Sequence, residues 1–245
     1  MSVRLSSFFA TFFLLATVVG SAQTALTVAA ASDLTLLEPF LQQEFEKTHP
    51  IRLRFVTGAS ATLAQQIENG APYDVFLSAN AQFVDRLASN GKIDPRSVRA
   101  YAIGQVGLLW KDGKQHDFKD LAANWVRIVA LPNPKLAPYG VAAQQALEHE
   151  GIWTTVQPKV VYGENVRQTL ELFESGNADA VLTSDSLLQG KPVTIVPNSW
   201  HNPILQKVGI TSSSVQPQAA KRFTDFLLSP AAQSIFNKFG FIPPP

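Results

Sequence analysis

Residues 26–69 read LTVAAASDLTLLEPFLQQEFEKTHPIRLRFVTGASATLAQQIEN, and this stretch alternates twice between a strand and a helix. Residues 26–30 form a short apolar run typical of a buried strand, and residues 36–48 carry apolar side chains at helical spacing. Residues 51–56 alternate as a second strand, and residues 61–69 predict a second helix. This order indicates parallel strands covered by helices.

The same alternation continues to the C-terminus. Further strands are predicted over residues 75–78, 101–110, 126–131, 159–162, 180–183 and 204–210. Further helices are predicted over residues 81–90, 139–149, 166–175, 216–228 and 230–239. Because the second half repeats the layout of the first, we predict an α/β fold with two lobes, each a mostly parallel sheet flanked by helices. One large doubly wound sheet is the alternative.

Two strands are expected to cross between the lobes and act as a hinge, near residues 103–106 and 208–212. Lobe I then comprises residues 23–103 and 212–245, and lobe II comprises residues 104–211. The C-terminal helices would return to lobe I. Ligands of open parallel sheets bind at the carboxyl ends of the strands. Two facing lobes therefore predict a ligand site in the cleft between them.

The N-terminus has the pattern of an export signal. Arg4 supplies a positive charge, residues 8–19 are almost entirely apolar, and residues 20–22 (Gly-Ser-Ala) suit a signal peptidase. We predict a cleavable signal peptide over residues 1–22 and a periplasmic mature protein. An uncleaved N-terminal anchor is the alternative. The apolar run is shorter than the roughly 20 residues of a typical membrane span.

Charge and composition exclude several classes of protein. Of the 20 basic and 19 acidic residues, only Arg4 lies within the first 22, so the rest of the chain has no net charge and no basic surface for nucleic acid is expected. The chain has no Cys, which excludes disulfides, thiolate nucleophiles and thiolate metal sites. The four His residues are scattered without metal-ligand spacing.

Four strand-to-helix junctions have small or hydroxyl residues where each helix is expected to start. They are AAASDL at 29–34, TGASATLA at 57–64, APYGVAA at 137–143 and GENVRQTL at 163–170. A helix start leaves backbone N–H groups without partners and carries a partial positive charge. Four such starts, two in each predicted lobe, would form an anion site without Lys or Arg. For any single junction, a plain helix cap is the alternative.

Four residues of these junctions are the candidate anion ligands. Ser32 and Ser60 each offer a hydroxyl and a backbone N–H. A proline in the first helical turn leaves the N–H of Tyr139 free to donate. Asn165, as a helix cap, leaves the N–H of Val166 free. An anion held by all four would bridge the lobes and favour a closed cleft.

Five segments of the chain resemble the periplasmic molybdate-binding proteins, the substrate-binding components of molybdate ABC transporters. They are residues 29–34, 58–79, 132–147, 162–181 and 229–241, the last reading SPAAQSIFNKFGF. The resemblance covers about residues 26–242 and implies the two-lobe, type-II periplasmic-binding-protein fold. It also implies that the protein captures molybdate or tungstate and delivers it to a membrane permease. We expect no cofactor, no nucleic-acid partner and a monomer.

The resemblance implies a role for each candidate residue. Ser32 and Ser60 match the two binding serines, and Tyr139 and Val166 match the positions that supply backbone N–H groups. Molybdenum would be bound only as its oxyanion, through these four residues. The N–H of Asp33 joins the site in some relatives. Its carboxylate must turn away from a dianion, and we expect it to cap the helical turn that follows.

One departure from the family pattern concerns a tyrosine hydroxyl donor. Many members have a segment Val-Tyr-x-x-Asp, whereas this chain has Leu182 at the tyrosine position. Thr183, Ser184 or the phenol of Tyr139 are candidates to replace that donor. The remaining alternative is a site with fewer hydrogen bonds.

Two other classes of function are alternatives. An enzyme would use Ser32 or Ser60 as a nucleophile, but no junction contains a His and neither serine lies in a Gly-x-Ser-x-Gly turn. The same fold could instead bind sulfate, phosphate or a small organic anion. Amino-acid binders of this type generally use an Arg, and Arg167 is the only one at a junction. A donor-only cage offers no acceptor to the proton of phosphate.

Overall fold

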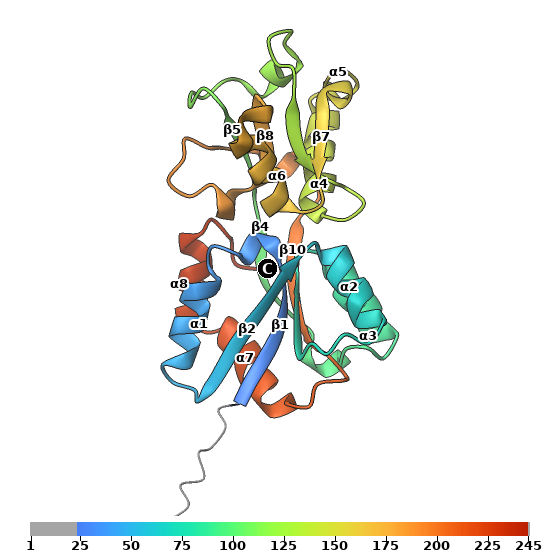
Figure 1. Ribbon diagram of the computed structural model, residues 1–245, viewed down its shortest axis with the longest axis vertical. Coiled ribbons are helices and arrows are strands. Elements are labelled where there is room, and N and C mark those ends of the chain that lie inside the picture. Colours follow the sequence, from blue (N-terminus) through green and yellow to red (C-terminus); the bar gives the residue numbers. More distant parts are fainter. Residues whose placement is uncertain (1–23, 245) are drawn as a thin grey trace, which may run out of the picture.

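The structure, a computed structural model, describes residues 24–244, which form two lobes stacked along the long axis of the molecule (Figure 1). Each lobe contains one five-stranded sheet with helices packed on it. The predicted two-lobe α/β architecture is confirmed, and the single doubly wound sheet is wrong. The predicted signal peptide, residues 1–22, lies outside the described residues. Between residues 24 and 244, no helix is long and apolar enough to span a bilayer.

Lobe I contains the strands from both ends of the described chain. In sheet order they are β2 (Ile51–Gly58), β1 (Thr24–Ala31), β3 (Val75–Ser78), β10 (Ile204–Ile210) and β4 (Arg99–Gly104). Its helices are α1 (Glu38–Glu46), α2 (Ser60–Glu68), α3 (Ala81–Ser89), α7 (Pro217–Leu227) and α8 (Pro230–Lys238), with the 3-10 turns η1 (Ser32–Leu34) and η2 (Pro95–Ser97). β1 is parallel to β2 and β3, whereas β10 runs antiparallel to β3 and β4.

Lobe II has the same plan. In sheet order its strands are β7 (Val160–Gly163), β6 (Val129–Pro132), β8 (Ala180–Ser184), β5 (Val106–Trp110) and β9 (Thr194–Ile195). Its main helices are α4 (Pro138–His149), α5 (Trp153–Val156) and α6 (Val166–Leu172). The short turns are η3 (Phe118–Ala122), η4 (Gln157–Lys159), η5 (Phe173–Asn177), η6 (Asp185–Leu187) and η7 (Asn198–Trp200). β6 is parallel to β7 and β8, and β5 is antiparallel to β8 and β9.

Strand β1 shows why helices cover both faces of the lobe I sheet. Successive side chains of a strand point to opposite faces. Leu26, Val28 and Ala30 therefore pack into one core with α1, α7 and α8, and Ala29 packs into a second core with α2 and α3. Figure 1 shows these two groups of helices on opposite sides of β1 and β2. The C-terminal helices α7 and α8 thus belong to lobe I, as predicted.

The two crossing segments differ in part from the prediction. The single strand predicted over residues 101–110 is divided at Gln105 into β4 of lobe I and β5 of lobe II. We placed residues 204–211 in lobe II and the second crossing at residues 208–212, and both placements are wrong. The chain returns to lobe I before Ile204, because all of β10 lies in the lobe I sheet beside β3 and β4.

Candidate functional site

The ends of two neighbouring strand pairs position the four predicted junctions. In lobe I, Ala31 at the end of β1 lies opposite Gly58 at the end of β2. In lobe II, Pro132 at the end of β6 lies opposite Gly163 at the end of β7. Parallel strands that end in register place the following helix starts side by side at the same edge of the sheet. Each lobe therefore presents two helix starts together.

The two serines of lobe I begin helices without capping them. Ser32 is the first residue of η1 and Ser60 the first residue of α2, while the caps are Ala31 and Ala59, which make no side-chain cap hydrogen bond. The plain-cap alternative is therefore wrong for both serines, because each lies one residue after the cap position. The hydroxyl of Ser60 accepts the N–H of Ala79 at 3.1 Å, which leaves its own proton free to donate.

The helix starts of lobe II expose backbone N–H groups. Asn165 caps α6, as predicted, by accepting the second and third N–H groups of the helix at 2.9 and 3.0 Å. Asn165 therefore does not bond the first N–H of the helix, that of Val166. Pro138 occupies the first position of α4, so the N–H of Tyr139 is the first that this helix offers. The Thr183 hydroxyl donates to the carbonyl of Val166 at 3.0 Å and holds the start of α6 in place.

All five predicted site residues line one small cavity between the lobes. Ser32, Asp33 and Ser60 come from lobe I, and Tyr139 and Val166 come from lobe II. All five residues are buried. The rest of the wall is small or apolar: Ala31, Gly58, Ala59, Ala79, Ala137 and Pro138. The cavity has room for about one water-sized sphere, and its described wall contains no Lys, Arg or His.

The carboxylate of Asp33 is turned away from this cavity into a hydrogen-bonded pocket. Its Oδ2 accepts the phenol of Tyr139 at 2.8 Å and the side-chain amide of Gln206 at 2.6 Å. The predicted cap is wrong, because the N–H of Thr35 in the following turn donates to the carbonyl of Ser32 instead. Two long-range donors thus keep the carboxylate away from the site.

The three candidates for the missing tyrosine donor all have other partners. Thr183 is bonded to Val166, and the Ser184 hydroxyl is 2.8 Å from that of another serine in η6. The Tyr139 phenol is bonded to Asp33. Leu182 itself lies in the apolar core of lobe II. Of the two alternatives, the geometry favours a site with fewer hydrogen bonds.

Two acidic side chains close to the site have raised pKa values. Burial raises the pKa of Asp33 to about 6, although the hydrogen bonds from Tyr139 and Gln206 act in the opposite direction. Burial also raises the pKa of Glu38 to about 7; the hydroxyl of Thr57 lowers it and the negative charge of Asp33 raises it. Within the described residues, Asp33 Oδ1 and Glu38 Oε1 have no hydrogen-bond partner. Near neutral pH, a bound dianion would have negative charge close by.

We expect Asp33→Asn to raise the melting temperature of the ligand-free protein at pH 8 by a few degrees. The pKa of Asp33 is higher in the folded protein than its ordinary 3.8, so its contribution to stability is present below pH 4 and is lost as pH rises through about 6. The asparagine variant cannot ionise at this position, so it does not lose that stability. Melting curves of both proteins at pH 4 and pH 8 test this, and equal differences at the two pH values would contradict it.

Two residues that contact Asp33, Gln206 and Ser186, were not predicted from the sequence. Gln206 is fully buried in β10, and the Ser186 hydroxyl donates to the backbone carbonyl of Asp33 at 2.5 Å, across the lobes. A polar residue in the middle of the apolar strand ILQKVGI was the available signal for Gln206. No local pattern marks Ser186.

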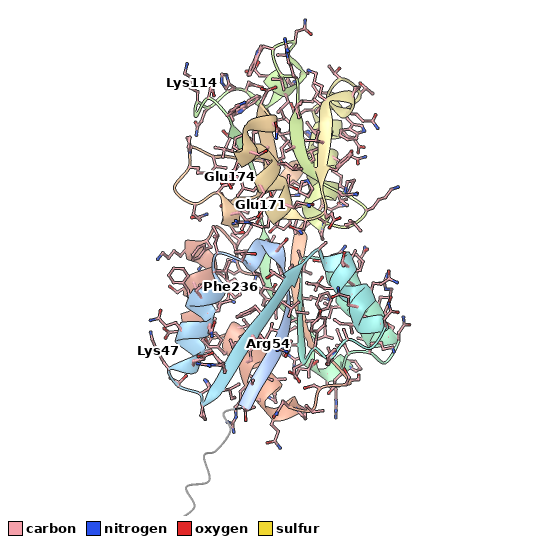
Figure 2. All side chains as sticks on the ribbon, in the orientation of Figure 1. Lys47, Arg54, Lys114, Glu171, Glu174 and Phe236 are labelled. Atoms are coloured by element: carbon pink, nitrogen blue, oxygen red, sulfur yellow. The ribbon has the colours of Figure 1, made fainter. Side chains whose placement is uncertain are left out.

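Several basic side chains lie on the outer surfaces or in ion pairs. Arg167 has its Nε 2.9 Å from Glu171 Oε1 at the surface of α6, so it does not enter the cavity. Lys47 and Lys114 lie on the outer surfaces of lobes I and II, away from their junction (Figure 2).

A larger hollow of about 850 Å³ in lobe I has paired charges in its wall, including Lys221 with Asp225 at 2.6 Å. Among the described residues, no three His, Asp or Glu side chains are grouped as a metal site.

Comparison with known proteins matches nearly the whole chain. Residues 26–242 match the family described as bacterial extracellular solute-binding protein. The molybdate-binding protein ModA of Rhodobacter capsulatus is 34% identical over 202 residues, which are 80% of this chain and 79% of the relative. That of Escherichia coli is 31% identical over 88% of both chains. The structure of the periplasmic molybdate-binding protein of Azotobacter vinelandii superimposes with a TM-score of 0.85, at 30% identity, over 90% of this chain and all of that one.

Proposed function

Because this chain belongs to the bacterial extracellular solute-binding proteins, we propose that it captures molybdate or tungstate between its lobes and delivers it to the permease of an ABC transporter. The observation that carries the proposal is the cavity at the lobe junction. It combines two serine hydroxyls with backbone N–H groups at four helix starts. Such a wall offers donors to an oxyanion and no formal positive charge.

The donor set is sufficient for tight binding of a dianion. A hydrogen bond to a charged group contributes roughly 1.5–3 kcal/mol net. Five to seven of them can offset much of the cost of removing water from the anion, whereas a micromolar complex needs only about −8 kcal/mol overall. We propose that Ser32 and Ser60 donate through hydroxyl and N–H, and that Asp33, Tyr139 and Val166 donate through N–H.

The size of the cavity argues against a larger organic ligand. Sites for drug-sized molecules measure roughly 300–1,000 Å³, whereas this cavity has room for about one water-sized sphere. Of the candidate ligands, a compact oxyanion needs the least rearrangement of the cavity wall. An amino acid would need far more space and a partner for its carboxylate, and Arg167 is paired with Glu171.

Sulfate is the strongest competing ligand, since it is also a compact tetrahedral dianion. Its bonds to oxygen are shorter, so a rigid cage fitted to molybdate would hold its donors at stretched distances from sulfate. Hydrogen bonds weaken as they lengthen and bend. Phosphate carries a proton near neutral pH, and a donor-only wall gives that proton no acceptor.

We propose that the protein acts in the periplasm as a monomer, after cleavage of the signal peptide predicted over residues 1–22. The donors are divided between the lobes, so the anion binds the closed arrangement better than an open one and shifts the population toward closure. The permease would then recognise the closed form. No enzymatic step is part of this function.

We expect the mature protein to bind one molybdate or tungstate ion at least a hundredfold more tightly than sulfate. The reason is the fit of the donor wall to a larger tetrahedral anion. Isothermal titration calorimetry with the three anions in one chloride buffer measures the ratio. Equal affinity for sulfate would contradict molybdate as the ligand, and tight binding of an amino acid would contradict the oxyanion site altogether.

A further inference from the structure

A buried group of three side chains connects the lobes directly behind the anion cavity. It consists of the carboxylate of Asp33 in lobe I, the phenol of Tyr139 in lobe II and the amide of Gln206 in β10, and we call it the interlobe latch. Tyr139 and Gln206 both donate to Asp33 Oδ2, at 2.8 and 2.6 Å. All three residues are at least 99% buried.

The backbone of β4 leaves space for this arrangement. A side chain at Gly104 would place its Cβ 2.0 Å from the phenol oxygen of Tyr139 and 3.1 Å from the amide nitrogen of Gln206. Glycine is therefore required at this point for Tyr139 to reach Asp33. Tyr101 of β4 fixes the other end of the amide, because its phenol donates to Gln206 Oε1 at 2.9 Å.

The Tyr139 phenol makes both latch bonds that join the lobes: it donates to Asp33 Oδ2 at 2.8 Å and accepts a longer bond from Gln206 Nε2 at 3.4 Å. Asp33 and Gln206 both belong to lobe I, so their bond can persist when the cleft opens. The bond from Tyr139 to Asp33 joins lobe II to lobe I and requires the closed arrangement. Asp33 and Tyr139 also line the anion cavity, so closure of the latch and completion of the cavity occur together.

We propose that the Tyr139 phenol is a positioning group that makes closure around the anion depend on the charge state of Asp33. When the lobes close, the carboxylate is buried and loses water. The phenol replaces part of that water with a charge-assisted hydrogen bond. It thereby keeps closure favourable while Asp33 is ionised and directs the negative charge away from the bound dianion. This inference rests on the proposed oxyanion function.

The other ionisable groups around Asp33 do not provide an alternative partner. Glu38 of α1 adds like charge, and Tyr101 of β4 is directed to Gln206. In η6, Asp185 is buried and would add like charge, and Gln189 donates to its backbone carbonyl at 3.1 Å. In α6, Arg167 is bonded to Glu171 at the surface. The two latch bonds are therefore the side-chain hydrogen bonds that the carboxylate receives.

Loss of the phenol has an effect that depends on pH. Without it, closing the lobes buries a carboxylate with only Gln206 as side-chain donor, which raises its pKa in the closed form further. At low pH the carboxyl group is protonated, so removing the phenol lowers the affinity only slightly. As pH rises through the pKa of Asp33 in the closed form, closure must either bind a proton or bury a poorly solvated charge, and the affinity falls.

The test is molybdate titration of the mature wild type and Tyr139→Phe at pH 5.5 and pH 8. We expect Tyr139→Phe to bind about ten- to a hundredfold more weakly at pH 8, the equivalent of one hydrogen bond to a charged group. The loss should be much smaller at pH 5.5. Adding Asp33→Asn to Tyr139→Phe should restore most of the affinity at pH 8 and remove the additional pH dependence.

Two further variants separate the latch from ordinary packing. Tyr73→Phe removes a phenol of lobe I that donates to Gln66 at 2.7 Å and makes no bond to the latch, so it should leave the pH dependence of affinity as in the wild type. Gly104→Ala keeps the phenol but displaces it, and should reproduce the pH-dependent loss of Tyr139→Phe. Small-angle scattering without ligand should show Tyr139→Phe more open than the wild type at pH 8.

The outcomes distinguish the latch from the proposed function. A wild type that does not bind molybdate refutes the proposed function, and scattering of the ligand-free proteins still tests the latch. A wild type that binds molybdate, with Tyr139→Phe equal to it at pH 8, refutes the latch alone. An equal loss at both pH values that Asp33→Asn does not reverse also refutes it, because packing alone then explains the loss.

Discussion

The double variant Ser32→Ala, Ser60→Ala is expected to bind molybdate about 10²- to 10⁴-fold more weakly than the wild type. Each substitution removes one hydroxyl that faces the cavity from the start of a helix. A hydrogen bond to a charged group contributes roughly 1.5–3 kcal/mol, and each 1.4 kcal/mol is about a tenfold change in affinity. The single variants should each lose about ten- to a hundredfold. Calorimetric titration of all four proteins measures these differences.

The control for the serine variants is Thr62→Ala, which removes an exposed hydroxyl two residues further along α2. Its affinity should equal that of the wild type. Ser60→Ala also removes the acceptor of the buried Ala79 N–H, so melting curves without ligand must show that the variant is folded at the titration temperature. Wild-type affinity in a folded double variant would exclude the serine hydroxyls as ligand donors.

Gly140→Ala is expected to weaken molybdate binding by about 10²-fold or more, although it adds only a methyl group outside the cavity. The new Cβ would lie 2.1 Å from the carbonyl oxygen of Pro132 and 2.8 Å from the backbone nitrogen of Pro134. Backbone atoms cannot rotate away as a side chain does, so the start of α4 must move. That movement displaces both the N–H and the phenol of Tyr139, two interactions worth roughly 1.5–3 kcal/mol each.

The neighbouring substitution Val141→Ala is the matched control for Gly140→Ala. Val141 is 41% exposed on the same helix, so its truncation should leave both affinity and melting temperature nearly unchanged. Circular dichroism establishes whether lobe II of Gly140→Ala is folded. A folded Gly140→Ala protein with wild-type affinity would contradict the placement of the anion at the start of α4.

The two interactions that α4 provides explain why its start matters more than any single donor. The helix start supplies an N–H to the cavity and a phenol to Asp33, and both require the lobes to be closed. The serines of lobe I, by contrast, are available to the anion before closure. We therefore expect Ser32→Ala to impair initial capture and Gly140→Ala to impair closure. Scattering with saturating molybdate would separate these two effects.

The elements and the candidate donors could be predicted from the sequence alone, because both depend on local properties. Apolar periodicity in residues 26–69 and its continuation predicted the strands and helices that build the two lobes. The chemistry of a helix start selected Ser32, Ser60, Tyr139 and Val166, since it depends on only a few adjacent residues. The family resemblance independently indicated the same positions. The structure brings all four to one cavity.

Only the tertiary structure decided which strand pairs with which, and where buried polar groups find partners. The pattern of residues 204–210 predicted a strand but not its neighbours, so β10 was placed in the wrong lobe. Asp33 was expected to cap its own helical turn, whereas its partners Tyr139 and Gln206 are 106 and 173 residues away. A carboxylate within a peptide can always find water or a nearby N–H. Its burial between two packed lobes removes that water, so only the donors that folding brings to the same place determine its partner.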